Sequence, residues 1–402
     1  MVDSNLDFAS LEPLVRQVFS IEDTTFGDLR RDGFLVRYRG RLLGADSETS
    51  YDQLSALLKP YDLTPLFRWD EGRHMILLLP GQPTPKPSNP WVNLILLIIT
   101  FFSVMVTGAL FSLQGELSED FGQAALQLVR EGWPFAVSIL AVLGAHEFGH
   151  YLVGRAHGVH VTLPYFIPMP ILNPFGTMGA FINMKELPKN RKVLLDIGLA
   201  GPFAGVLVAI PVLILGLMLS SLEPIPMEIP EGMYLQVEGN SLLYLLLKFL
   251  VFGQLLPQPV SYEGLSPLLY WVMYFFTGQP FPFGGLDVTI HPVALAGWGG
   301  LLVTALNLLP AGQLDGGHVI YVLLGRNRAR RLLPFVLTTT FLLGFVSPSW
   351  WLWTLLISVF GRVNAEPLDE ITPLNPARKV MAIAAMVLFV LVFTPVPLLI
   401  KM

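Results

Sequence analysis

Three ionisable residues, His146, Glu147 and His150, lie close together inside one long apolar segment. The two histidines are four residues apart, so a helix would direct both imidazoles to the same side. Two such nitrogens can bind one Zn²⁺ ion at about 2.0–2.1 Å each. Glu147 would then lie beside the ion, where a carboxylate can act as general base on zinc-bound water. A chance match is the alternative, but ionisable residues are costly in lipid and are usually functional there.

A four-coordinate catalytic zinc site that keeps a water needs a third protein ligand, and the absence of cysteine excludes a thiolate. We favour Asp315, which follows an apolar segment that should end on the same membrane side as His150. One proline and three glycines near Asp315 should break the helix there. Irregular backbone at membrane depth is tolerated where it lines a wet cavity, and a carboxylate there would complete a His₂Asp site. The alternative is that Asp315 caps the next helix.

The other histidines are weaker candidates for the metal. His157 and His160 follow the first motif closely, but a continuing helix would carry His157 two turns away from a shared ion. We therefore predict surface or interfacial positions for both. His291 begins an apolar segment on the opposite side and is predicted to cap it, whereas His74 and His318 are not assigned to the core site.

Asn307 lies roughly two turns before the predicted helix break. Its side-chain amide could donate a hydrogen bond to the oxyanion of a tetrahedral intermediate. Asparagine also makes hydrogen bonds between packed membrane helices. The sequence leaves these two interpretations open.

A short segment between the two motifs is predicted to be a strand that dips toward the site. Its residues alternate loosely in polarity and are flanked by turn formers; they are Gly176, Thr177, Met178, Gly179, Ala180 and Phe181. An exposed strand edge could pair with the extended backbone of a substrate. A helical substrate must first unwind to this extended form, because its scissile carbonyl is otherwise held in a helical hydrogen bond. A strand without substrate contact is the alternative.

The composition places these residues in a membrane protein. Hydrophobic residues make up 53% of the 402 residues and charged residues 14%, against about 25% charged in an ordinary soluble domain. The net charge of −5 gives no indication of nucleic acid as a partner. No nucleotide-binding segment is evident.

The elements that must position the site are apolar spans. We predict an α-helical polytopic membrane protein with about six to eight transmembrane helices and a small N-terminal α+β soluble domain. The predicted spans cover residues 91–112, 134–153, 193–220, 292–309, 332–346, 350–360 and 380–398. Residues 241–252 and 265–277 are too short to span and are predicted to be interfacial or re-entrant. We predict three domains. Residues 1–89 form the soluble domain, with a βαββ module and a Pro-rich linker. Residues 90–325 form the membrane core, and residues 326–402 form the C-terminal helices.

Charged residues near the span ends predict the orientation. Basic residues follow the second span and precede the fifth, at Arg155, Lys185, Lys189, Arg191, Lys192, Arg326, Arg328, Arg330 and Arg331. Acidic residues follow the first and third spans, at Glu116, Glu119, Asp120, Glu223, Glu228, Glu231 and Glu238. This predicts a cytoplasmic N-terminus. Since residues 1–19 resemble neither a signal peptide nor a transit peptide, we expect a multi-pass protein of a prokaryotic plasma or thylakoid membrane.

The pairing of HEFGH at residues 146–150 with NLLPAGQLDGGH at residues 307–318 resembles the site-2 protease family of intramembrane zinc metalloproteases, peptidase family M50. The resemblance covers roughly residues 91–324. It implies that His146, His150 and Asp315 bind Zn²⁺, that Glu147 is the catalytic base, and that Asn307 positions substrate or stabilises the oxyanion. Residues 161–205 are similar to the EGY-type branch of plastids and cyanobacteria, which also carries a soluble extension before the membrane core.

The resemblance implies a metalloendopeptidase that performs regulated intramembrane proteolysis. It would hydrolyse peptide bonds of membrane-anchored protein substrates near the cytoplasmic face, with the lipid bilayer as its other partner. Two alternatives remain. One is a non-proteolytic membrane zinc transporter or sensor, although the sequence lacks a series of ligands across other spans. The other is a membrane peptidase of the prenyl-protein type, which takes a glutamate rather than Asp315 as its third ligand.

Overall fold

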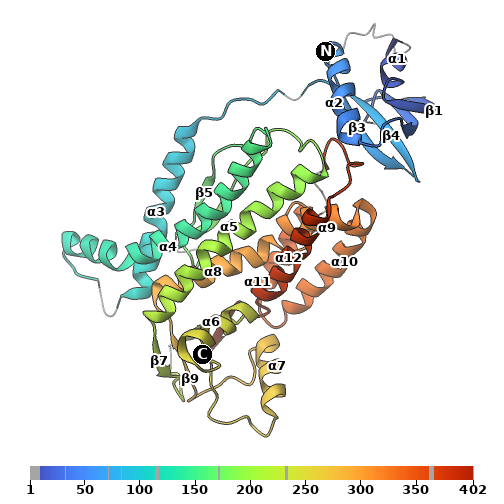
Figure 1. Ribbon diagram of the computed structural model, residues 1–402. Coiled ribbons are helices and arrows are strands. Elements are labelled where there is room, and N and C mark those ends of the chain that lie inside the picture. Colours follow the sequence, from blue (N-terminus) through green and yellow to red (C-terminus); the bar gives the residue numbers. More distant parts are fainter. Residues whose placement is uncertain are drawn as a thin grey trace.

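The computed structural model describes residues 10–401 except 32, 71, 83, 114–116, 171–172, 231–233 and 362–365. Figure 1 shows a small α/β unit at one end of the molecule, long helices in the middle, and short helices and strands at the opposite end. The predicted acidic loop residues Glu116 and Glu231 lie outside the described residues.

The N-terminal unit is an antiparallel sheet with the strand order β1-β2-β4-β3, and helix α2 packs against β3. Its elements are α1 (Glu12–Val15), β1 (Phe19–Phe26), β2 (Val36–Leu42), α2 (Ser47–Leu58), the 3-10 turn η2 (Lys59–Tyr61), β3 (Leu63–Asp70) and β4 (Arg73–Pro80). The predicted βαββ order is present from β2 to β4, but the sequence analysis missed β1. A bulge between Ile21 and Asp23 interrupts the alternation of its side chains, which removes the usual strand pattern.

The middle of the molecule is a helical bundle in which α4 packs against α3, α5 and α8. Its helices are α3 (Pro90–Ser112), α4 (Phe121–Ala156), α5 (Arg191–Met218), α8 (Pro292–Asn307), α9 (Asp315–Leu324), α10 (Arg326–Leu343), α11 (Ser349–Phe360) and α12 (Pro376–Val392). Within the described residues, α3, α4 and α5 are long and apolar enough to cross a membrane. The described part of the chain is therefore mostly helical, and three of its helices have the length and apolarity of membrane spans.

Several boundaries differ from the predicted spans; the last predicted span, 380–398, extends past the end of α12 at Val392. Helix α4 begins at Phe121, not at Pro134, and Pro134 lies inside the helix, which bends along its length (Figure 1). Proline often begins a helix, which is why the sequence suggested a start there, but membrane helices also tolerate it inside. The arginines predicted for a loop near residue 326 instead form the first turns of α10.

The end opposite the N-terminal unit contains short elements. They are β7 (Ser221–Pro224), β8 (Leu235–Glu238), α6 (Leu242–Phe252), α7 (Pro267–Thr277), β9 (Leu286–Thr289) and β10 (Leu398–Lys401), with β7 pairing β9 and β8 pairing β10. Helices α6 and α7 have 11 residues each, so each is about 16 Å long, roughly half the thickness of a hydrocarbon core. Glu238 is buried and accepts a hydrogen bond from Tyr244 at 2.7 Å, so its carboxylate is not a solvated loop charge.

The connection between α11 and α12, residues 366–372, fastens the N-terminal unit to the bundle. On one side, Leu368 and Glu370 exchange backbone hydrogen bonds with Phe67 of β3 at 2.9 and 3.0 Å. On the other side, the backbone N–H groups of Leu368 and Asp369 donate to the carbonyls of Pro188 and Lys189 at 2.9 and 2.8 Å. The connection therefore lies between β3 and the segment that leads into α5.

Asp369 is fully buried at the centre of this contact. Its carboxylate accepts hydrogen bonds from the Ser47 hydroxyl at 2.9 Å and from the backbone of Ile371 at 2.7 Å. Exposed ion pairs surround it: Lys192 donates to Glu48 and lowers the pKa of that carboxyl. Such surface pairs contribute about 0–1 kcal/mol, so the buried carboxylate is the stronger fastening.

Replacing Asp369 with alanine should loosen the N-terminal unit, because the Ser47 hydroxyl and the Ile371 amide would lose a buried acceptor. We expect a loss of at least about 2 kcal/mol in the stability of the docked unit. Hydrogen exchange of β3 amides and limited proteolysis before α3 would measure it. The matched control is Asp52→Ala, which removes only the exposed partner of Lys189. Equal effects of the two substitutions would contradict this role for Asp369.

Candidate metal centre

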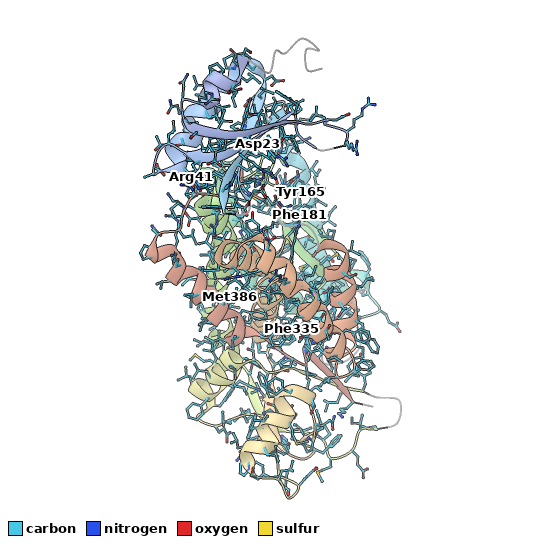
Figure 2. All side chains as sticks on the ribbon, turned by 90° about the vertical axis from the view of Figure 1, so that its right-hand side faces the viewer. Asp23, Arg41, Tyr165, Phe181, Phe335 and Met386 are labelled. Atoms are coloured by element: carbon cyan, nitrogen blue, oxygen red, sulfur yellow. The ribbon has the colours of Figure 1, made fainter. Side chains whose placement is uncertain are left out.

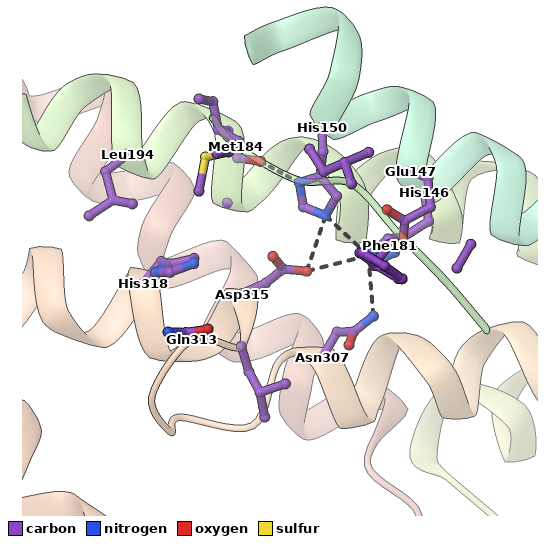
Figure 3. Close-up of a pocket in the computed structure, with 15 residues that line it drawn as sticks. His146, Glu147, His150, Phe181, Met184, Leu194, Asn307, Gln313, Asp315 and His318 are labelled. Atoms are coloured by element: carbon purple, nitrogen blue, oxygen red, sulfur yellow. Dashed lines mark hydrogen bonds and ion pairs between the residues drawn. The ribbon is translucent and has the colours of Figure 1, made fainter. Parts of the chain in front are cut away.

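The structure brings the three predicted ligand residues together. Nε2 of His146 and Nε2 of His150 lie 3.2 Å apart, and each lies 3.3 Å from Oδ2 of Asp315. Figure 3 shows the two imidazoles descending from α4 toward the carboxylate, which comes from the first turn of α9. His146 and His150 are buried, and Asp315 is nearly so. Within the described residues, these three form the one group of His, Asp or Glu side chains spaced to hold a metal ion.

The spacing and the chemistry of these donors fit a zinc ion. Ligand atoms at about 2.0–2.1 Å from a tetrahedral ion are about 3.3 Å apart, as these atoms are. Nδ1 of His150 lies 2.7 Å from the carbonyl oxygen of Ile197, which can only accept, so Nδ1 carries the proton. In the neutral ring, Nε2 then presents a lone pair to a carboxylate oxygen that has only lone pairs. A cation between them removes that repulsion.

The close approach of α5 to α4 depends on a glycine. A Cβ atom at Gly201 would lie 2.0 Å from Nε2 of His150, so a larger residue cannot share this position with the ring. At Gly205 a Cβ atom would lie 3.2 Å from Nδ1 of His146. These two glycines therefore allow α5 to pack closely against the histidines. The same packing places the Ile197 carbonyl against His150.

Asp315 is brought to the site by the break between α8 and α9. Helix α8 ends at Asn307, and the chain turns through residues 308–314, where Gly312 adopts a φ of +53°. Asp315 is the first residue of α9, where the helix dipole favours a negative side chain. The N-cap residue of α9 is Leu314, and the helix has no side-chain cap. Asp315 therefore does not cap α9, and the alternative interpretation of this residue is wrong.

Glu147 and Asn307 line the same cavity, of about 200 Å³, as the three ligand candidates. Glu147 is buried, and Ile182, which follows β6, lines the same cavity. Nδ2 of Asn307 lies 3.2 Å from Nε2 of His146, so its amide is directed at the ligand cluster (Figure 3). The cavity thus contains a carboxylate and an amide donor beside a cluster that can hold a metal.

The predicted strand is present as β6 (Thr177–Phe181), which pairs with β5 (Tyr165–Pro168) in an antiparallel hairpin. Gly176 precedes the strand. Figure 2 shows Tyr165 and Phe181 side by side, and their rings stack with centroids 5.4 Å apart. Ala180 and Phe181 line the cavity, so the strand reaches the site. In the described part of the chain, β6 pairs only with β5, which leaves its other edge open.

The remaining histidines lie outside the cluster. His157 pairs with Asp196 at 3.0 Å, and the exposed His160 pairs with Glu186 at 2.8 Å. His291 caps α8, as predicted, and His74 accepts a hydrogen bond from the backbone of Leu42. His318 lines the cavity without touching the ligand atoms in any contact that the structure describes.

Other cavity residues were not predicted. His318 was left out of the core site and Gln313 was not considered, although both belong to the second motif, and their position in it could have suggested them. Ile197 acts through its backbone carbonyl, for which no residue type gives a signal.

Comparison with known proteins gives one family. The model of peptidase family M50 matches residues 134–347, just over half of the chain. The chain is 31% identical over 285 residues to the probable zinc metalloprotease EGY1, chloroplastic, of Arabidopsis thaliana. The aligned region covers 70% of this chain and 45% of that protein. It is 26% identical over 403 residues to the probable zinc metalloprotease EGY2, chloroplastic, of Oryza sativa subsp. indica, covering 97% of this chain and 66% of that protein. The chain spans about half to two thirds of the length of these relatives.

Removing the carboxylate of Asp315 should abolish metal retention. An Asp315→Ala variant would keep two imidazoles but lose the one anionic donor, so we expect zinc in the purified protein to fall from about one ion per chain to near zero. Elemental analysis of detergent-purified protein would measure this. His160→Ala, which removes an exposed imidazole, is the control. Full zinc content in Asp315→Ala would mean that another residue, such as a glutamate, is the third ligand.

A methyl group at Gly201 should displace the His150 ring without removing any ligand. We expect Gly201→Ala to weaken zinc affinity by about 10- to 100-fold, the range typical for residues that orient ligands. Competition with a chelator would measure the affinity. Gly144→Ala is the matched control, because a Cβ atom there meets nothing within 4 Å. Unchanged affinity in Gly201→Ala would contradict the proposed close fit of α5 against His150.

Proposed function

The chain belongs to peptidase family M50, and we propose that it is a zinc-dependent endopeptidase that hydrolyses membrane-anchored proteins within or beside the bilayer. The observation that carries the proposal is the convergence of His146, His150 and Asp315 in one cavity with Glu147. Helix α4, which supplies three of these residues, is long and apolar enough to cross a membrane. The names of the relatives, which describe those proteins as probable zinc metalloproteases, support the same chemistry.

The roles of the residues follow from their positions. A zinc ion held by His146, His150 and Asp315 would supply electrophilic activation of water and of the scissile carbonyl. Glu147 accepts a proton from the attacking water and delivers it to the amine nitrogen as the C–N bond breaks. The Asn307 amide donates a hydrogen bond to the oxygen on which negative charge develops. One water is consumed, and a carboxyl and an amine terminus result.

Strand β6 is proposed to hold the substrate. A peptide that pairs with its open edge is extended, which exposes the carbonyl that a helix would hide in a hydrogen bond. The strand ends near Glu147, because Ile182 directly follows the strand and lines the same cavity as that carboxylate. The substrate residues of this proposal are Gly176, Thr177, Met178, Gly179, Ala180 and Phe181.

We propose three parts for the chain: residues 1–89, the membrane core 90–325, and the C-terminal helices 326–402. The third part also completes the first, since Ile371 packs into the core of the N-terminal sheet. For the membrane, we propose six to eight spans, formed by α3, α4 and α5 together with α8, α10, α11 and α12. A cytoplasmic N-terminus agrees with the arginines of α10, which begins near the N-terminal unit (Figure 1). The expected location, a prokaryotic plasma or thylakoid membrane, stays a prediction.

Substitution of Glu147 with glutamine should stop cleavage while zinc remains bound. Glutamine has nearly the same shape but cannot accept the proton, and general-base catalysis contributes about 10²- to 10⁴-fold. Comparative membrane proteomics should then reveal single-span fragments that accumulate in Glu147→Gln cells. Glu186→Gln, which alters a carboxylate outside the cavity, is the control.

The same experiment separates the alternative functions. If wild type and Glu147→Gln gave identical membrane fragments and differed instead in zinc uptake or efflux, the protein would be a transporter or sensor. Loss of zinc from Glu147→Gln would contradict the assignment of this residue as a base that does not bind the metal.

A further inference from the structure

A second cavity, of about 410 Å³, adjoins the candidate metal centre. Ala180, Phe181, Gln313 and Leu314 line both cavities, so the two lie side by side. We propose that the second cavity binds apolar side chains of the substrate's membrane segment, a few residues from the cleaved bond, and that α11 sets which sizes fit. This inference rests on the proposed protease function and extends it to substrate selection.

The cavity has three walls. Met178, Ala180 and Phe181 of β6, with Ile167 of β5, form the first wall, and Ala311, Gln313 and Leu314 form the second. The third is α11, which contributes Trp353, Leu356 and Ile357. These three residues have the spacing i, i+3, i+4 and therefore lie on one face of the helix.

The lining selects an apolar occupant. Among the described residues that line the cavity, none has a charged side chain, and Gln313 is the only one with a side-chain amide. A charged residue of the substrate would lose its hydration there without gaining a partner, which is costly. The volume is within the range of about 300–1,000 Å³ that ligand pockets have, so the cavity can hold more than one side chain.

The position along β6 indicates which part of the substrate enters. Ile182 and Phe181 lie at the metal centre, whereas Met178 lines only the second cavity. From residue 182 to 178 the strand advances about 13 Å, at about 3.3 Å per residue. A peptide paired with this edge would therefore place residues about two to four positions from the cleaved bond over the second cavity.

The third wall lies beyond the part of the chain that matches the family. The match ends at residue 347, and α11 begins at Ser349. The cavity therefore combines a shared catalytic region with a wall that the family model does not include. Substrate selection can then differ between relatives through α11 without any change in the metal ligands.

Filling the cavity should change selectivity while leaving catalysis intact. The test uses the full-length protein in vesicles with two single-span reporter substrates, which differ only in carrying Leu or Ala residues two to four positions from the cleaved bond. For Ile357→Trp, we expect kcat/KM to fall about 10-fold or more for the Leu reporter and less than about 3-fold for the Ala reporter. Leu356→Trp fills the same space from a second position, and Trp353→Ala should raise the preference for larger side chains.

Leu352→Trp is the matched control, because Leu352 is exposed on α11 and does not line the cavity. A photoreactive residue at position 356, but not at 352, should cross-link the Leu reporter in a Glu147→Gln background, which reports binding without cleavage. The inference is overturned if wild type cleaves both reporters and the variants that retain zinc leave their ratio unchanged, as they would if the cavity held only a lipid chain. If wild type cleaved neither reporter, the proposed function itself would fail.

Discussion

The constraint on which the rest of the structure depends is the meeting of three lone-pair donors in a buried site. Nε2 of His146, Nε2 of His150 and Oδ2 of Asp315 lie 3.2–3.3 Å from one another. Without a positive charge between them, a carboxylate in this position would be an uncompensated buried anion, which costs several kcal/mol. The packing of α4 against α5, the break between α8 and α9, and the hydrogen bond from His150 to Ile197 all hold the donors in this arrangement. The fold thus places three side chains that could hold a metal ion at its centre.

A second requirement follows from the first, because the site needs irregular backbone in an apolar surrounding. The β5–β6 hairpin and residues 308–314 are not helical, and their free backbone groups must be satisfied inside the protein. Polar residues of α3 meet part of this need. Asn93 donates to the carbonyls of Leu163 and Pro164 at 2.8 and 3.0 Å, and Ser103 donates to the carbonyl of Gly176. Polar residues in an otherwise apolar span therefore serve the hairpin that faces the site.

The sequence predicted what depends on local spacing and missed what depends on backbone contacts between distant segments. Helical periodicity is enough to put His146 and His150 on one face, and the glycines and proline near Asp315 are enough to indicate a break. The partner of His150 is a carbonyl of Ile197, and a carbonyl is present at every residue, so no pattern marks it. The same holds for residues 366–372, whose backbone bonds to Phe67, Pro188 and Lys189 have no signature in side-chain type.

These backbone contacts also change how the N-terminal unit should be interpreted. Residues 366–372 hold β3 on one side and the Pro188–Lys189 carbonyls on the other, and Asn190 then caps the first turn of α5. From Asn190 to Ile197, whose carbonyl orients His150, the chain advances about 10 Å along one rigid helix. Removal of the unit would take Phe67 and Ser47 away from residues 368–370, which contact the segment that leads into that helix. A loss of activity after truncation of the unit would therefore have two explanations, the displacement of α5 and the loss of substrate recognition. Only a substitution on the free face of the unit, away from β3 and Asp369, can separate the two.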